Sequence, residues 1–302
     1  MYRILTNDGL QVGAIAKLKD LGFEVVNHHY DQSILGEELK KFDAVVIRSA
    51  TKLTAEVLKE AKGGNLKLAI RAGVGIDNID INYAKSIGIE VRNTPNSSSD
   101  SVAELVIGHM FSLARFIGDA NVTMRNGKWN KKLYQGNEIS GKTLGIIGMG
   151  RIGRSLAKKA EGLGLNVIYY TIEGKHEDLK YDFRTFEEVL KNSDYISLHV
   201  PYDKDKGALI SDKEFDIMKK EAYLINCARG KVVDEKALLK ALEEEKLAGA
   251  GIDVFEQEPT MNLELINHSK VSVTPHIGAA TREAQNRIGE EVVDTLKSFF
   301  KI

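Results

Sequence analysis

The feature that most constrains the fold of this chain is a glycine-rich turn near its middle. The apolar run Thr143–Ile147 ends in Gly148-Met149-Gly150-Arg151-Ile152-Gly153, and an amphipathic segment follows. A strand, this glycine pattern and a helix, in that order, form the context that a dinucleotide-binding motif requires. Gly148 would permit the tight turn, Gly150 would let backbone approach a pyrophosphate, and Gly153 would let the helix lie close to the strand. A turn that serves packing alone is the alternative, and the context favours the nucleotide site.

About half of the chain precedes this turn, which predicts a second domain. The 302 residues suit one large domain or two ordinary ones. Short apolar runs alternate with helical patterns along the whole chain, and this alternation favours parallel sheets covered by helices on both faces. The predicted strands are Arg3–Thr6, Glu24–Asn27, Ala44–Ile47, Leu68–Arg71, Glu90–Asn93, Thr143–Ile147, Asn166–Tyr170, Tyr195–Leu198, Tyr223–Asn226, Gly249–Asp253 and Val271–Thr274.

Two helical stretches, Ser101–Arg125 and Thr281–Phe300, have the positions of connectors between domains. Capping boxes that start at Ser101, Thr185 and Ser211 predict helix N-termini at those residues. We therefore predict an α/β protein of two doubly wound domains, with a ligand cleft between them. The predicted boundaries are residues 1–95 and 281–302 for a substrate domain and residues 96–280 for the dinucleotide-binding domain.

The composition excludes several classes of function. A net charge of −1 provides no basic field that would recruit nucleic acid or an anionic membrane. The apolar runs are too short to span a bilayer, and the N-terminus enters a strand-like run directly, without a signal-peptide core. The single cysteine, Cys227, excludes an intrachain disulfide and fits a reducing compartment, so we expect a cytoplasmic protein. No metal site is expected, because His28 and His29 lack a partner at metal-ligand spacing.

One motif is misleading. The segment Gly136–Thr143 satisfies the Walker A pattern G-x-x-x-x-G-K-[ST]. A phosphate-binding loop of that kind follows a strand and opens a helix, whereas Gly141-Lys142-Thr143 opens a predicted strand. We therefore interpret the segment as a turn and reject ATP or GTP binding.

Concentrated polar groups follow three predicted strands in the second half of the chain. The segments are Asn226–Gly230, Asp253–Pro259 and Thr274–Ala279. In a doubly wound sheet the carboxyl ends of the strands face the ligand crevice. These segments are therefore the candidate source of catalytic groups.

Redox chemistry on a 2-hydroxy acid needs three kinds of group, and these segments contain all three. Arg229 offers a planar fork that binds a carboxylate in a bidentate way. His276 offers an imidazole that can accept the hydroxyl proton near neutral pH. Glu258 offers a carboxylate that can orient the imidazole and stabilise its cation. Taken singly, each is more typical of a solvated or loop residue than of a catalytic one.

Taken in order, these segments resemble the D-isomer-specific 2-hydroxyacid dehydrogenase family, and the resemblance covers nearly the whole chain. It implies an NAD-dependent oxidoreductase in which a Rossmann domain is inserted into a flavodoxin-like substrate domain, and it gives Arg229, Glu258 and His276 the roles just described. Three stretches are similar to the branch that oxidises 3-phosphoglycerate to 3-phosphohydroxypyruvate in serine biosynthesis. The stretches carrying the resemblance are Gly148–Gly153, Asn226–Gly230, Asp253–Phe255, Glu258-Pro259, Thr274–Gly278 and Asn93–Asn96, and those of the phosphoglycerate branch are Arg71–Asn78, Asn226–Asp234 and Thr281–Gln285.

The resemblance also implies contacts to the cofactor. Arg151 and Ile152 would lie along the pyrophosphate, and Asp253 would lie near the nicotinamide carboxamide. In full, the implied cofactor residues are Gly148, Gly150, Arg151, Ile152, Gly153, Thr171, Val200, Pro201, Cys227, Ala228, Asp253, Gly278 and Ala279.

For the substrate, the resemblance implies a loop of Gly73, Val74 and Gly75, in which Val74 and Gly75 give backbone N–H groups to the carboxylate. In members that handle phosphoglycerate, an arginine matching Arg48 binds the substrate phosphate, and a basic residue matching Lys131 reaches it across a homodimer. A solvated surface charge is the alternative for both residues.

The chain departs from the family pattern at the cofactor ribose. NAD-preferring members usually carry an acidic residue at the end of the second Rossmann strand, where Thr171 stands here. Glu173 could substitute for it, whereas Lys175 and His176 could tolerate NADP. We favour NAD and leave NADP open. Many members of the phosphoglycerate branch continue into a serine-binding regulatory domain, and because this chain ends at Ile302 we expect it to lack that feedback.

Two other functions stay open. The substrate could be another 2-hydroxy acid, such as glycerate, lactate or a branched-chain analogue. The protein could also be a non-catalytic sensor of NAD on the same fold, like the C-terminal-binding-protein corepressors. Steady-state turnover separates the second possibility from an enzyme.

Overall fold

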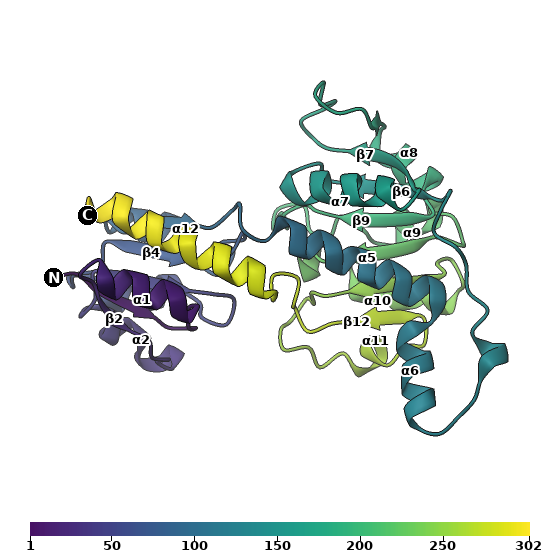
Figure 1. The fold of residues 1–302 in the computed structure, drawn as a ribbon. Coiled ribbons are helices and arrows are strands. Elements are labelled where there is room, and N and C mark those ends of the chain that lie inside the picture. The colour runs from purple at the N-terminus through teal and green to yellow at the C-terminus, as the bar shows by residue number, and fades with distance from the viewer. The chain divides into compact units, whose positions relative to one another are not determined.

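The computed structural model describes all 302 residues, which form two compact units (Figure 1). Unit 1 comprises Met1–Ser98 and Ala279–Ile302, and unit 2 comprises Ser99–Gly278. Each unit has its own parallel sheet covered by helices, so the predicted α/β fold class is confirmed.

Unit 1 is built on a five-stranded parallel sheet with the order β2-β1-β3-β4-β5. This is the flavodoxin-like order, which reverses direction between β1 and β3. The strands are β1 Arg3–Thr6, β2 Glu24–Val26, β3 Ala44–Ile47, β4 Leu68–Arg71 and β5 Glu90–Asn93; the helices are α1 Val12–Asp20, α2 Gln32–Leu39, α3 Ala55–Ala61, α4 Ile81–Ser86 and α12 Arg282–Phe300.

The core of unit 1 follows from the two-residue period of its strands. In β1, Ile4 packs with α1 and α12 on one face of the sheet, while Leu5 packs with α2 and α3 on the other. In β3, Val45 and Val46 divide between the two faces in the same way. Because both faces are covered, the strands are apolar at consecutive positions, as buried parallel strands are. In Figure 1, α12 lies beside α1.

Unit 2 contains a seven-stranded parallel sheet with the order β12-β11-β10-β9-β6-β7-β8. The order reverses between β6 and β9, which is the Rossmann arrangement with one further strand. The strands are β6 Thr143–Ile147, β7 Asn166–Tyr170, β8 Asp182–Phe183, β9 Tyr195–Leu198, β10 Tyr223–Asn226, β11 Gly249–Ile252 and β12 Val271–Val273; the helices are α5 Ser99–Arg115, α6 Ile117–Arg125, α7 Arg151–Gly162, α8 Phe186–Asn192, α9 Asp212–Ile217, α10 Glu235–Glu243 and α11 Leu263–Ile266, with 3-10 turns η1 Lys131–Leu133 and η2 Gly230–Val232.

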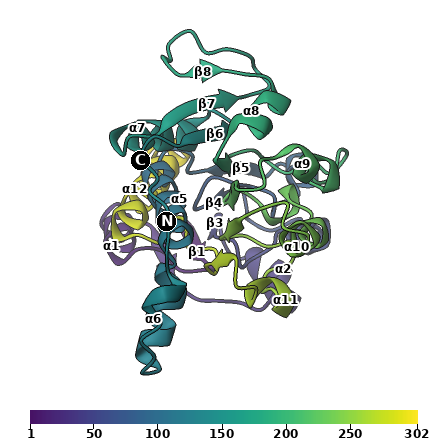
Figure 2. The ribbon, with the colours of Figure 1, turned by 90° about the vertical axis from the view of Figure 1, so that its right-hand side faces the viewer.

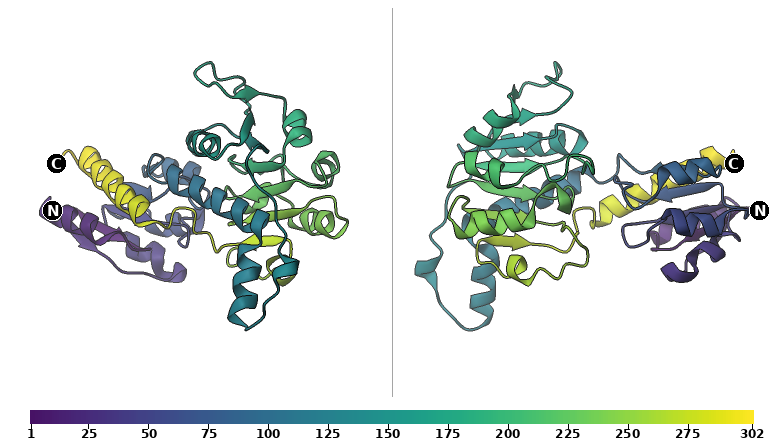
Figure 3. Two further views of the ribbon diagram at one scale, coloured as in Figure 1. Left: turned by 45° about the vertical axis from the view of Figure 1, so that its right-hand side comes forward. Right: turned by 180° about the vertical axis from the view of Figure 1, so that it is seen from behind.

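Two apolar clusters cover the two faces of the unit 2 sheet. Buried residues of α5 and α7, such as Met110 and Leu156, form one cluster, and those of α8 and α10, such as Leu190 and Leu238, form the other. Figure 2 shows α5 and α7 on one side of the sheet and α8, α9 and α10 on the other. Helix α6, which has no buried residue, extends away from this sheet in both views of Figure 3.

All the predicted strands are present, and three of them end one residue early. The residues left out are Asn27, Asp253 and Thr274. Each of them uses its side chain in a hydrogen bond at the strand end, Asn27 with Thr6 and Asp253 with Thr274. Strand β8 was not predicted, because two residues are too short to show a period.

The prediction of one connector helix over Ser101–Arg125 is wrong. The chain breaks at Phe116, whose backbone is left-handed with φ 54°, and α5 and α6 are bent by 66°. The capping box at Ser101 is also wrong, since α5 already begins at Ser99, whereas the box at Thr185 is confirmed. No single helix is long and apolar enough to cross a bilayer; only α5 and α6, taken together as a bent pair, meet that criterion by length and composition.

Candidate active site

The glycine turn between β6 and α7 has the geometry that its sequence predicts. Gly148 is left-handed with φ 98°, and a Cβ there would lie 2.4 Å from the His199 carbonyl oxygen. A Cβ at Gly153 would lie 2.4 Å from the Gly148 carbonyl oxygen, so the helix could not approach the strand. A Cβ at Gly150 would meet nothing within 4 Å. The first turn of α7 has no side-chain cap at Gly150. Open space before uncapped N–H groups fits a pyrophosphate.

Most of the other predicted cofactor residues lie at the carboxyl edge of the same sheet. Thr171 follows β7, Val200 and Pro201 follow β9, and Cys227 and Ala228 follow β10. Because these strands are parallel, their carboxyl ends meet at one edge. Ala279 is the exception, since it belongs to unit 1, where its carbonyl accepts a hydrogen bond from Gln285.

The loop after β7 carries a carboxylate two residues beyond the position where the family pattern predicts one. Thr171 is 7% exposed, and its hydroxyl donates a hydrogen bond to the carboxylate of Glu173. This hydrogen bond and the backbone N–H of Glu173 lower the pKa of the Glu173 carboxyl. An ionised carboxylate therefore stands beside Thr171.

The turn that carries Arg229 is held by Asn226, which sequence reasoning did not single out. Asn226 is 1% exposed; its Nδ2 donates to the Arg229 carbonyl at 2.8 Å, and its Oδ1 accepts from the Ala228 N–H at 3.0 Å. The Arg229 guanidinium donates from Nη1 to the Ala228 carbonyl at 2.6 Å. A buried side chain thus fixes the backbone at the root of the arginine.

Glu258 and His276 are in direct contact. His276 Nδ1 lies 2.6 Å from Glu258 Oε2, and Glu258 Oε1 accepts from the Phe255 N–H at 3.1 Å. Burial acts to raise the pKa of Glu258, but the hydrogen bond from His276, the His276 charge, the Phe255 N–H and the Arg229 charge together lower it. An ionised Glu258 can only accept, so Nδ1 carries a proton and Nε2 of the neutral ring is left as a proton acceptor.

The turn that carries His276 is strained and is held by Asp253. His276 is left-handed with φ 53°, and its N–H donates to the Asp253 carbonyl at 2.8 Å. The Asp253 carboxylate, 1% exposed, accepts from Thr274 Oγ1 at 2.6 Å, from the Ile277 N–H at 2.8 Å and from the Gly278 N–H at 2.9 Å. Left-handed backbone at a residue other than glycine persists only where the surroundings fix it. Asp253 provides that support.

Two titratable groups at the same edge are neutral. Burial, with a smaller contribution from the Asp253 charge, raises the pKa of the Cys227 thiol well above its ordinary value. Burial lowers the pKa of His199 to about 4, and its Nε2 lies 2.9 Å from the Ser197 hydroxyl. Both residues suit a structural role better than acid–base chemistry.

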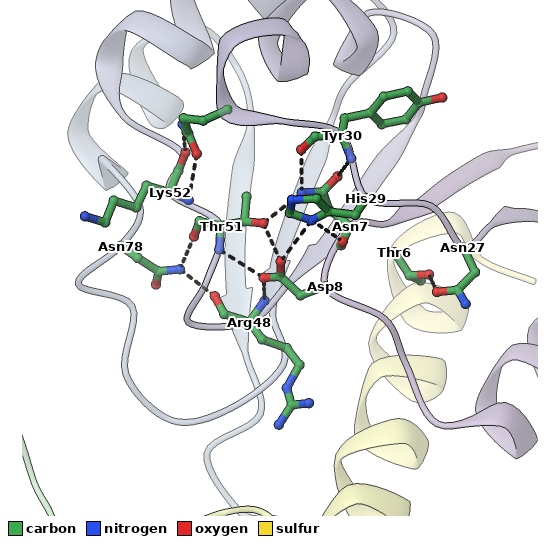
Figure 4. Close-up of polar contacts among 11 residues, drawn as sticks. Thr6, Asn7, Asp8, Asn27, His29, Tyr30, Arg48, Thr51, Lys52 and Asn78 are labelled. Atoms are coloured by element: carbon green, nitrogen blue, oxygen red, sulfur yellow. Dashed lines mark hydrogen bonds and ion pairs between the residues drawn. The ribbon is translucent and has the colours of Figure 1, made fainter. Parts of the chain in front are cut away.

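In unit 1, the backbone of Arg48 is held by a buried carboxylate (Figure 4). Asp8 Oδ2 accepts from the Arg48 N–H at 2.6 Å and from the Thr51 N–H at 3.1 Å, while Oδ1 accepts from Thr51 Oγ1 at 2.6 Å. The Asp8 side chain is 6% exposed. The Arg48 guanidinium points away from this cluster in Figure 4. The network therefore fixes the loop and leaves the charged group to other partners.

Asn78 completes the same network. Its Nδ2 donates to the Arg48 and Thr51 carbonyls, each at 2.6 Å. The loop after β3 is thereby tied to the loop after β4. Sequence reasoning missed Asp8 and included Asn78 in the stretch Arg71–Asn78 without giving it a role. A polar residue just after β1, at the carboxyl edge, was an available indication for Asp8.

The Gly73–Gly75 loop leaves donors unused. Gly73 has φ 151°, a backbone conformation that residues other than glycine rarely adopt. The Gly73 carbonyl accepts from the Thr94 N–H at 3.0 Å, and the Val74 carbonyl accepts from Asn93 Nδ2. The N–H groups of Val74 and Gly75 make no hydrogen bond within the chain. Two free donors beside each other suit an anionic ligand.

Of the predicted substrate residues, Arg48 and Gly73–Gly75 lie at the carboxyl edge of the unit 1 sheet. Lys131 lies elsewhere, at the start of η1 in unit 2. The structure thus brings Glu258 and His276 together and holds Arg48 beside the loop after β4.

Comparison with known proteins places the chain in a family. A family model described as "D-isomer specific 2-hydroxyacid dehydrogenase, NAD binding domain" matches residues 107–278. The chain belongs to this family. It is therefore an NAD(P)-dependent oxidoreductase.

Individual relatives differ in their substrates. The chain is 41% identical to a hydroxypyruvate reductase of Thermotoga maritima, over 98% of this chain and 97% of that one. It is 40% identical to a D-3-phosphoglycerate dehydrogenase of Bacillus subtilis over its whole length, but it spans only 57% of that relative. A solved NADPH-dependent glyoxylate/hydroxypyruvate reductase of Sinorhizobium meliloti, in complex with NADP and malonate, is 28% identical with a TM-score of 0.87, over 99% of this chain and 93% of that one.

Proposed function

We propose that this protein interconverts D-3-phosphoglycerate and 3-phosphohydroxypyruvate with NAD. The observation that carries the chemistry is the 2.6 Å contact between His276 and Glu258, beside a turn that presents Arg229. The observation that favours a phosphorylated substrate is Arg48, whose backbone is fixed while its guanidinium points away from the residues that fix it. Serine biosynthesis in the cytoplasm is the setting that such an activity implies.

His276 is the proposed acid and base. In oxidation, Nε2 accepts the proton of the substrate hydroxyl, and Nδ1 keeps its proton in the hydrogen bond to Glu258. The ionised Glu258 stabilises the imidazolium that results. The nicotinamide, when bound, supplies the acceptor for the hydride that leaves C2. In reduction, His276 returns the proton to the C2 oxygen.

Substrate recognition is assigned to arginines and backbone donors. Arg229 would bind the carboxylate through its planar fork. The free N–H groups of Val74 and Gly75 would add donors to the same carboxylate. Arg48 would bind the phosphate, which carries more charge than any group on an unphosphorylated 2-hydroxy acid. These assignments leave His276 as the one group that must change its protonation state.

The chain's own residues favour NAD over NADP. The pyrophosphate would lie against Gly150 and the first turn of α7, and Asp253 and Cys227 would line the nicotinamide side. The ionised Glu173, held by Thr171, would accept hydrogen bonds from the ribose and repel a 2′-phosphate. Glu173 would thereby do what an acidic residue at position 171 does in NAD-preferring relatives.

The second candidate is a hydroxypyruvate reductase. The near-complete mutual coverage with the Thermotoga maritima reductase favours it. Initial rates with 3-phosphohydroxypyruvate and hydroxypyruvate, each with NADH and NADPH, separate the two. Our proposal expects the higher kcat/KM for the phosphorylated acid with NADH. A higher kcat/KM for hydroxypyruvate would favour the second candidate over the first. Cofactor binding without turnover of either acid would indicate a nucleotide sensor.

We also propose that the protein acts as a homodimer. The arm of α6 and η1 exposes Val122, Met124, Trp129 and Leu133 at 59%, 52%, 78% and 70%. Several large apolar side chains on one arm are typical of a protein interface. Lys131 lies on this arm and could reach the substrate phosphate of the partner subunit. Light scattering tests the dimer: wild type should have twice the mass of the chain, and Trp129→Lys with Leu133→Lys should be monomeric.

A further inference from the structure

A buried imidazole lies beneath the turn that carries His276. His109, on α5, is 2% exposed. Its Nδ1 lies 2.9 Å from the Ser272 hydroxyl, and its Nε2 lies 3.1 Å from the Thr274 hydroxyl. Gly251 makes room for it, since a Cβ there would lie 2.8 Å from the Cβ of His109. The ring is thus placed in contact with strand β12 and the residue after it.

The direction of each hydrogen bond follows from what each group can donate. The ionised Asp253 can only accept, so the single hydroxyl proton of Thr274 points to Asp253 Oδ1 at 2.6 Å. Thr274 must then accept from His109, which places the ring proton on Nε2. Nδ1 is left to accept from Ser272. The neutral form agrees with the burial, which lowers the pKa of His109 against the opposing effect of the Asp253 charge.

This series of hydrogen bonds, from His109 through Thr274, ends at the Asp253 carboxylate, which fixes the turn that carries His276. Asp253 accepts the N–H groups of Ile277 and Gly278 through its side chain and that of His276 through its carbonyl. A shift of the carboxylate would therefore move the backbone that directly follows the left-handed His276. We propose that His109 is a positioning residue that acts through Thr274 and Asp253 to hold His276 in place. The inference rests on the proposed role of His276 as acid and base.

A positioning role for His109 requires that a substitute keep a hydrogen-bond donor to Thr274, whereas packing requires only that it keep the volume of the ring. Leucine fills much of the space of the ring but donates nothing, whereas glutamine can still donate from its amide to Thr274. The pair His109→Leu and His109→Gln therefore separates volume from hydrogen bonding. Thr274→Val and Thr274→Ser make the matched pair one step closer to Asp253.

The experiment combines kinetics with amide hydrogen exchange on the full chain. His109→Leu and Thr274→Val should lower kcat by about 10-fold to 100-fold, the range for a misplaced catalytic group. The dissociation constant of NADH should change by a smaller factor than kcat, because the pyrophosphate turn between β6 and α7 is untouched. Exchange of the Ile277 and Gly278 amides should become faster while that of α10 is unchanged. His109→Gln and Thr274→Ser should stay close to wild type in all three measurements.

Two results would overturn the inference. One is a kcat for His109→Leu close to that of wild type, with unchanged exchange at Ile277 and Gly278. The other is an equal loss of kcat in His109→Leu and His109→Gln, accompanied by a lower unfolding temperature in both variants. That result would indicate that His109 serves packing alone. If wild type turns over no 2-oxo acid, the proposed function fails by itself. Exchange at Ile277 and Gly278 then decides, since faster exchange in His109→Leu alone supports the positioning role and any other pattern rejects it.

Discussion

The two sheet edges of this protein use buried carboxylates for the same purpose but present different chemistry. In unit 1, Asp8 fixes the loop of Arg48, and in unit 2, Asp253 fixes the turn of His276. The unit 1 edge offers a guanidinium and two free N–H groups, all of which are hydrogen-bond donors only. The unit 2 edge offers an imidazole paired with an ionised carboxylate. On the proposed roles, phosphate recognition by Arg48 and proton transfer by His276 belong to different units, and each is supported by its own buried aspartate.

The largest expected effect is on kcat and comes from removing the imidazole at the unit 2 edge. His276→Ala should lower kcat by about 10²–10⁴-fold, the usual contribution of a positioned acid–base group. NADH binding should persist, because the glycine turn at β6 and α7 is untouched. Steady-state rates and NADH fluorescence titration measure both quantities. Near-normal turnover in this variant would remove His276 from the mechanism.

The second effect compares the arginines of the two edges. Arg229→Ala should lower kcat/KM for phosphorylated and unphosphorylated 2-oxo acids alike, by about 30-fold or more, since it removes a charged contact to the shared carboxylate. Arg48→Ala should lower kcat/KM by a similar factor for 3-phosphohydroxypyruvate and leave hydroxypyruvate nearly unaffected. Parallel rates on both substrates give the ratio. Equal losses on the two substrates in Arg48→Ala would contradict phosphate recognition by unit 1.

A smaller effect concerns the ribose end of the unit 2 edge. Glu173→Gln should raise the ratio of kcat/KM with NADPH to that with NADH by about tenfold. A factor of this size corresponds to the loss of one hydrogen bond from a charged group to the ribose. Glu187→Gln removes the charge of another exposed glutamate, on α8, and is the control. The ratio in that variant should match wild type. An unchanged ratio in Glu173→Gln would show that Glu173 does not determine the cofactor preference, and Thr171 would be the next residue to test.

The smallest effect is on stability and its pH dependence. The pKa of Glu258 is lowered in the folded protein, so its ionised form stabilises the fold above the unfolded pKa, and this contribution is lost as pH falls through the folded pKa. Glu258→Gln should therefore be less stable than wild type near pH 7, and the difference should shrink below about pH 4. Thermal unfolding of both proteins across that range measures it. A constant difference would mean that the charge of Glu258 does not stabilise the fold.

Much of the fold was predictable because parallel strands that are buried on both faces consist of consecutive apolar residues, which are visible in the sequence. Runs such as Ala44–Ile47 and Thr143–Ile147 have the strand bounds expected of them. The break at Phe116 was not predictable, because the apolar spacing of α5 continues without interruption into α6. Strand β8 was missed since two residues carry no period.

For the candidate site, the sequence by itself determined the glycine turn, the segments after β10, β11 and β12, and hence the residue types available for chemistry. A local turn depends on a few adjacent dihedral angles, so its pattern is visible in the chain. Only the tertiary structure decided which of these residues meet. Glu258 reaches His276 across 18 positions, Asp253 reaches Gly278 across 25, and His109 reaches Thr274 across 165. Such contacts exist only after helices and strands have packed, because packing of distant segments, and no local pattern, brings their side chains within hydrogen-bond distance.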